Sequence, residues 1–131
     1  MKNTILVVDD EEPIQELIHT YLSPLSGDIR SAFTGEEAVA MYEEMLEAGN
    51  RPDLVIMDLK MPGMDGIETT SHIMDMDPQA RIYGFTAFSR SVWATEMKKA
   101  GARRVISRGI GFNGLREIVE ETLETEKIPA Y

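Results

Sequence analysis

The sequence contains no cysteine among its 131 residues. Disulfides and thiolate metal sites are therefore excluded, and the composition fits a reducing cytoplasm. No run of about 18 apolar residues is present, so no membrane span is predicted. The start of the chain lacks the apolar region and cleavage site of a secretory signal. Net positive charge is also missing, because the formal charge is −10. Direct nucleic acid binding is disfavoured, since phosphate contacts need clustered Lys and Arg.

The length and composition are those of one globular domain. Apolar residues make up 43% of the chain, which is enough for a buried core. The chain is too short for two ordinary domains. No linker, repeat or low-complexity segment divides it. We expect one domain over residues 1–126 and a short C-terminal tail over residues 127–131.

Short apolar runs alternate with longer stretches of helical period. Runs that are apolar on both faces are typical of parallel strands covered by helices on each side. The run at 28–33 is weaker, as on an edge strand, with Ile29 and Phe33 facing one way. The predicted strands cover residues 4–8, 28–33, 54–57, 82–85 and 105–106.

Each stretch between these runs carries helix signals. A stripe at helical spacing runs from Ile14 to Leu22 and includes Leu17. Asn113 precedes the last stripe, and Gly49 and Gly101 follow the ends of two helices. The N-terminal signals are Pro13, Thr34 with Glu37, Asp65 with Glu68, and Ser89 or Ser91.

Five alternating βα units in this length predict an α/β fold with an open, doubly wound sheet. A closed barrel of such units needs about 250 residues. Right-handed crossovers with helices on both faces favour the flavodoxin-like strand order 2-1-3-4-5. Ligands of such sheets bind beyond the carboxyl ends of the strands, between strands 1 and 3.

Chemically active side chains follow four of the five predicted strands. Asp9 and Asp10 follow the first, Asp58 the third, Thr86 the fourth and Arg108 the fifth. Two carboxylates about 4 Å apart repel by roughly 4 kcal/mol at an effective dielectric of 20. A site built in this way must take up a proton or bind a cation. Oxygen ligands without His or Cys select a hard ion, and Mg²⁺ suits a few carboxylates plus water.

A cation beside a carboxylate, a hydroxyl and a basic side chain suits phosphoryl transfer. The transition state spreads negative charge over three oxygens, which positioned donors and cations stabilise. We expect Asp58 to be the nucleophile, with Thr86 and Arg108 each contacting a phosphoryl oxygen. The turn after Asp58 brings the backbone carbonyl of Lys60 toward the metal.

These motifs resemble the receiver domain of two-component response regulators, from the first strand to the last helix. The resemblance implies that Asp10 and Asp58 bind Mg²⁺ directly with the Lys60 carbonyl, while Asp9 acts through water. It also implies a phosphohistidine donor on a sensor histidine kinase or a histidine phosphotransfer protein. The matching segments are Ile5-Leu6-Val7-Val8-Asp9-Asp10-Glu11-Glu12-Pro13, Asp58-Leu59-Lys60-Met61-Pro62-Gly63-Met64-Asp65-Gly66, Thr86-Ala87 and Gly101-Ala102.

The chain departs from the family pattern near its fifth strand. Arg108-Gly109 stands where the family has Lys-Pro, and Arg is a planar fork with a different reach. The stretch from Gly109 to Gly111 is expected to be looser than with a proline. Val105 stands where the family often has the aromatic residue that rotates during activation. Phosphorylation is expected to survive these changes, whereas the usual coupling of phosphate to the surface lacks its rotating aromatic residue.

Several alternatives remain open from sequence. The chain could be a degenerate receiver, a protein interaction module that ignores phosphorylation, and Arg108 could be a solvated arginine. A phosphatase on this fold is disfavoured, because Lys60 occupies the position of its acid/base carboxylate. We expect no enzymatic activity other than the chain's own phosphorylation and dephosphorylation. Trp93 is either core or a partner contact. If the chain forms a homodimer, the last two βα units are its expected interface. The chain is either a stand-alone regulator or a receiver excised from a larger protein.

Overall fold

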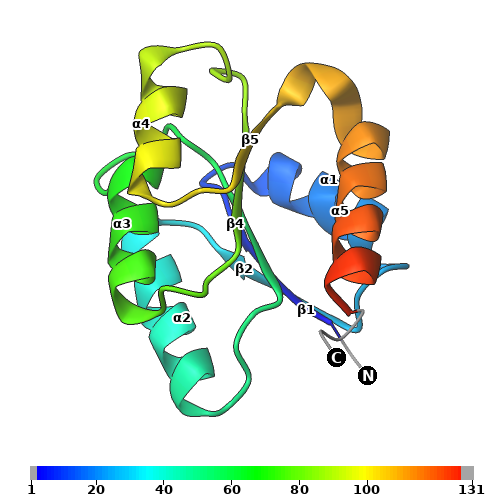
Figure 1. The fold of residues 1–131 in the computed structure, drawn as a ribbon. Coiled ribbons are helices and arrows are strands. Elements are labelled where there is room, and N and C mark those ends of the chain that lie inside the picture. Colours follow the sequence, from blue (N-terminus) through cyan, green and yellow to red (C-terminus); the bar gives the residue numbers. More distant parts are fainter. Residues whose placement is uncertain (1–2, 128–131) are drawn as a thin grey trace.

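A computed structural model describes residues 3–127, with five strands that alternate with helices (Figure 1). The strands are β1 (Thr4–Val8), β2 (Asp28–Ala32), β3 (Leu54–Met57), β4 (Ile82–Thr86) and β5 (Arg104–Ser107). The helices are α1 (Glu12–Leu22), α2 (Gly35–Glu47), α3 (Gly66–Met76), α4 (Val92–Ala100) and α5 (Gly111–Lys127), and a 3-10 turn, Arg108–Ile110, precedes α5. None of the helices in this part of the chain combines the length and apolar character needed to cross a bilayer.

The five strands form one parallel sheet in the order β2-β1-β3-β4-β5. The predicted doubly wound fold and strand order are therefore confirmed. β1 and β3 pair side by side, with Val8 opposite Met57, although a whole βα unit separates them in sequence. This pairing places the residues that follow β1 and β3 next to each other at one edge of the sheet.

Helices cover both faces of the sheet. In Figure 1, α1 and α5 lie on one side and α2, α3 and α4 on the other. Successive residues of β1 point to opposite faces, so Ile5 and Val7 pack under α1 and α5 while Leu6 and Val8 pack on the other side. All residues of β1, β3 and β4 are buried. The continuous apolar runs of the sequence follow from this two-sided burial.

Three predicted helix starts are confirmed by hydrogen bonds. The Thr34 hydroxyl accepts from the Glu37 N–H at 3.0 Å, and the Asp65 carboxylate accepts from the Glu68 N–H at 2.9 Å. At α4 the cap is Ser91, whose hydroxyl accepts from the Ala94 N–H. Each cap satisfies a backbone donor that the first turn of a helix leaves unpaired.

The fifth strand and the helix after it differ from the sequence prediction. The strand extends over Arg104–Ser107, and α5 begins at Gly111 rather than beyond Asn113. The Ser107 hydroxyl accepts from the Gly109 N–H at 3.0 Å, which organises the expected loose stretch into a 3-10 turn. Gly111 then turns the chain into α5 with a φ of +78°, a conformation that favours glycine.

Smaller differences concern single side chains and the chain end. β2 ends at Ala32, and Phe33 beyond it is 40% exposed. Leu17 is 41% exposed, because the buried face of α1 runs through Gln15, Ile18 and Leu22. Of the expected tail, Lys127 is the last residue of α5, and residues 128–131 lie outside the described residues.

Candidate functional site

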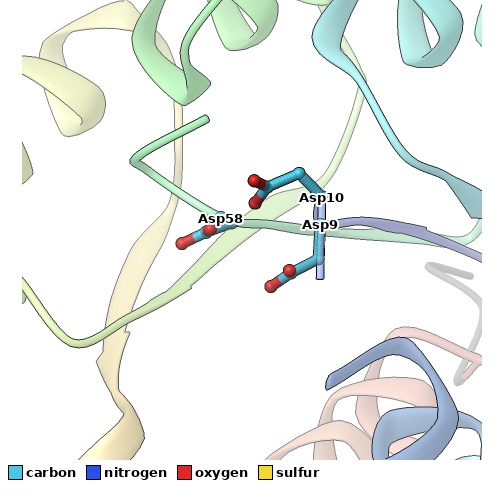
Figure 2. A group of neighbouring side chains, drawn as sticks. All are labelled: Asp9, Asp10 and Asp58. Carbon is cyan, nitrogen blue, oxygen red and sulfur yellow. The ribbon is translucent and has the colours of Figure 1, made fainter. Parts of the chain in front are cut away.

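Three carboxylates meet at the carboxyl ends of β1 and β3. Asp9 and Asp10 follow β1, and Asp58 follows β3. One carboxylate oxygen from each lies within 4.8 Å of the others. Figure 2 shows the three side chains pointing to the same side of the view. The structure thus brings together the three acids that the sequence placed at the switch point of the sheet.

The carboxylates differ in their surroundings. Asp9 is 1% exposed and Asp58 is 9% exposed, whereas Asp10 faces solvent. Asp9 accepts from the Glu11 N–H and Asp58 from the Leu59 N–H, each at 2.8 Å. These backbone bonds fix the orientation of both buried carboxyl groups but leave an oxygen of each available.

Burial makes the ionised form of both buried acids costly. Burial, reinforced by the charge of Asp9, raises the pKa of Asp58 to about 7. Burial also raises the pKa of Asp9, against the lowering effects of the Glu11 N–H and the Arg108 guanidinium. At neutral pH the group therefore needs a proton or a nearby cation.

Arg108, which follows the edge strand β5, supplies one such cation. Its Nη2 donates to Asp9 Oδ2 and lies 3.5 Å from Asp58 Oδ1. The guanidinium carbon lies 5.4 Å from the centre of the Phe85 ring. The Arg108 side chain is only 21% exposed, so it belongs to the site and is not a solvated surface arginine.

Thr86 ends β4 on the same rim. Met57 pairs with Gly84, so the residues that follow β3 run alongside the end of β4. Thr86 is fully buried, and its hydroxyl accepts from the Phe88 N–H at 3.1 Å. The hydroxyl proton is not used in that bond, which leaves it free to be donated to a group near the strand ends.

The turn from Asp58 into α3 leaves no room for a side chain at Gly66. A Cβ atom there would lie 2.2 Å from the Asp58 carbonyl oxygen and 2.9 Å from the Leu59 Cα. The Gly66 N–H also donates to the Leu59 carbonyl at 2.9 Å. The glycine therefore allows the first turn of α3 to lie against the backbone that carries Asp58.

One residue, Gln15, and one contact, between Lys60 and Trp93, were missed by sequence reasoning near the site. The Gln15 side-chain nitrogen lies 2.9–3.1 Å from the carbonyls of Val7, Asp9 and Ala32, so it ties the β1–α1 turn to β2. Its position three residues before buried Ile18 was the available signal. The Lys60 ammonium lies 3.7 Å from the centre of the Trp93 ring, a contact between the loop after β3 and the first turn of α4 that sequence spacing does not reveal.

The comparison with protein families decides the family of this chain. Residues 5–120 match the family described as the response regulator receiver domain. The chain belongs to this family. The match spans the stretch from β1 into α5 and includes every side chain of the acidic cluster, Thr86 and Arg108.

Curated relatives place the receiver domain among two-component regulators. It is 33% identical to the chemotaxis protein CheY of Halobacterium salinarum, over 94% of this chain and 98% of that protein. It is 34% identical to the transcriptional regulatory protein ZraR of Salmonella typhimurium, over 93% of this chain but only 26% of that protein. The chain thus spans about a quarter of the length of the second relative.

A solved structure supports the same assignment. A two-component response regulator of the LuxR family from Aurantimonas superposes with a TM-score of 0.81 at 31% identity. The match covers 95% of this chain and 87% of that chain. The receiver domain described here therefore shares both its fold and its family with known response regulators.

Proposed function

We propose that this receiver domain is a phosphoacceptor switch in which Mg²⁺ assists transfer of a phosphoryl group to Asp58. The observation that carries the proposal is the gathering of Asp9, Asp10 and Asp58 within 4.8 Å, with Arg108 against two of them. Burying crowded carboxylates costs free energy of folding, so a structural role alone does not explain them. A functional role does.

The donor set fits Mg²⁺. All three side chains offer carboxylate oxygens, and no His or Cys lies among them. Asp10 and Asp58, with the backbone carbonyl of Lys60, would bind the ion directly, and Asp9 would act through water. The ion would supply positive charge against the phosphoryl oxygens.

The residues of the chain have separate tasks in the transfer. A carboxylate oxygen of Asp58 attacks the phosphorus of a phosphohistidine, the P–N bond breaks, and the imidazole nitrogen keeps the electron pair. The product is an acyl phosphate on Asp58. The Thr86 hydroxyl would donate to one phosphoryl oxygen and the Arg108 guanidinium to another, so Arg108 must turn from Asp9 toward the new group.

The natural phosphodonor would be a sensor histidine kinase or a histidine phosphotransfer protein in the cytoplasm. The receiver domain would occupy residues 1–126 and catalyse only its own phosphorylation and dephosphorylation. Homodimerisation through the last two βα units would use exposed residues there, which include Val92 at 68% and Ile110 at 45% exposure. The alternative of a phosphorylation-independent module is not favoured, because Arg108 reaches the acids.

Incubation with acetyl phosphate and Mg²⁺, followed by intact mass spectrometry, tests this function. We expect the wild type to gain the mass of one phosphoryl group and Asp58→Asn to gain none. Asp75→Asn, which changes an exposed acid of α3, is the matched control and should be phosphorylated like the wild type. An unmodified wild type, or equal labelling of Asp58→Asn, would contradict the proposal.

A further inference from the structure

A cation and two aromatic rings lie between the site and the surface of α4. The Lys60 ammonium lies 3.7 Å from the centre of the Trp93 ring and 5.5 Å from that of Phe88. The two rings meet edge to face, with centres 6.3 Å apart, and each residue is 44% exposed. Lys60 belongs to the loop after β3, Phe88 lies in the loop between β4 and α4, and Trp93 lies in the first turn of α4. The three residues, called here the Lys60 cluster, therefore join the loop after β3 to the loop before α4 and to the first turn of α4.

Phe88 connects this cluster to the site through its main chain. The Phe88 N–H donates to the Thr86 hydroxyl at 3.1 Å, and its carbonyl accepts from the Ser91 hydroxyl at 2.6 Å. Ser91 in turn caps α4. One residue thus links the hydroxyl at the end of β4 to the first turn of α4.

Lys60 connects the cluster to the site from the other side. It lies two residues after Asp58, and two residues span at most about 7 Å. Its stem is flexible and its ammonium has three donors, so the group can turn from the ring toward a ligand on Asp58. The Lys60 side chain is exposed and forms no ion pair with a carboxylate in the described part of the chain, so the aromatic rings are what hold it in place.

We propose that a phosphoryl group on Asp58 competes with the Trp93 ring for the Lys60 ammonium, so that phosphorylation uncovers Trp93 on the surface of α4. The inference rests on the proposed function of Asp58. A charged phosphoryl oxygen is a stronger partner for an ammonium than an exposed ring face. The freed ring lies next to Val92, which is 68% exposed, and the two would offer a partner protein an apolar contact that the unphosphorylated state covers.

Tryptophan fluorescence tests the first half of this inference, because Trp93 is the only tryptophan of the chain. Acrylamide, an uncharged quencher, should reach Trp93 more readily after treatment with acetyl phosphate and Mg²⁺. Unphosphorylated Lys60→Ala should already show this increased quenching, since its ring has lost its cover. Lys98→Ala, an exposed lysine on the same helix, should match the wild type in both states.

Reciprocity supplies the second test. If the phosphoryl group must draw Lys60 away from Trp93, the free energy of the Lys60–Trp93 contact opposes binding at Asp58. Removal of the ring should therefore strengthen that binding by the free energy of the lost contact. Trp93→Leu should therefore bind the phosphoryl mimic beryllofluoride, with Mg²⁺, about twofold to fivefold more tightly than the wild type. Val92→Ala, on the same exposed surface, should bind it like the wild type.

Intact mass, measured on the same samples, separates this inference from the function on which it rests. Phosphorylated wild type with unchanged acrylamide quenching would overturn the role of Lys60 and leave the phosphoacceptor function standing. Equal or weaker beryllofluoride binding by Trp93→Leu would also overturn it. A wild type that gains no phosphoryl group would overturn both.

Discussion

The carboxylates of Asp9, Asp10 and Asp58 form the acidic half of the site, and Arg108 forms its basic half. The fold holds the two halves in place to different degrees. Asp9 and Asp58 follow β1 and β3, central strands in which every residue is buried and which have a neighbour on each side. Arg108 follows β5, an edge strand in which only Ile106 is buried. The carboxylates are therefore held by the core, whereas the guanidinium reaches them on a long side chain. This difference suits a site in which the acids stay in place and the arginine changes partner.

The largest expected effect concerns the acidic half and its pH dependence. A folded pKa of about 7 for Asp58 lies above the ordinary value of 3.8, so the folded state binds the proton more tightly than the unfolded state. The contribution of Asp58 to stability is fully present below pH 4 and is lost as the pH rises to about 7. Without metal at pH 8, the free energy of unfolding of Asp58→Asn should exceed that of the wild type by on the order of 2–4 kcal/mol.

Urea unfolding in EDTA at pH 8 and at pH 4 measures this difference. The advantage of Asp58→Asn should nearly vanish at pH 4, because the folded carboxyl is then protonated and the pH is close to the ordinary value of 3.8. Asp75→Asn controls for the loss of one exposed charge on α3. An asparagine variant that is no more stable than the wild type at pH 8 would show that the acidic half is not strained.

The basic half should show the opposite sign. Arg108→Gln leaves Asp9 and Asp58 without their cation, so in EDTA at pH 8 it should lose about 1.5–3 kcal/mol of unfolding free energy. Saturating Mg²⁺ should restore most of this loss, because the ion replaces the missing charge. Arg103→Gln makes the same charge change at an exposed position of the described chain. Equal losses in the two variants, measured by urea unfolding, would mean that the contact with Asp9 contributes nothing.

Alanine substitutions of one glycine near each half, Gly66 and Gly109, compare how tightly the two backbones pack. They should have the smallest effects on the free energy of unfolding. Gly66→Ala places a Cβ against the Asp58 carbonyl and should cost about 1–3 kcal/mol. Gly109→Ala meets only the Ser107 hydroxyl, at 3.1 Å, and should change stability by less than about 0.5 kcal/mol. Thermal unfolding of both variants checks the ranking, and a larger loss in Gly109→Ala would reverse the comparison.

The acidic half was also the half that the sequence could predict. Unbroken apolar runs and caps at Thr34 and Asp65 locate elements from local signals alone. The strand order then follows from connection rules, and it places Asp9 and Asp58 together without knowledge of any contact. The prediction succeeded there because each signal is local and the topology rules are strong.

The basic half depends on contacts that no local pattern encodes. The 3-10 turn after β5 depends on a hydrogen bond that the Gly109 N–H donates to the Ser107 hydroxyl. A Gly-Ile-Gly stretch alone predicts a loose loop. Whether Arg108 reaches Asp9 depends on two segments about a hundred residues apart in the chain, so sequence left it open. The Lys60 contact with Trp93 was missed for the same reason.

Calorimetric titration with Mg²⁺ is the most direct test of the claim that Asp9, Asp10 and Asp58 form one cation site. The wild type should bind one Mg²⁺ per chain, with an affinity that falls as the pH drops below the pKa of Asp58, about 7. Asp10→Asn should bind the ion far more weakly, and Asp75→Asn should bind it like the wild type. Absence of saturable binding by the wild type, or equal binding by Asp10→Asn, would contradict the account.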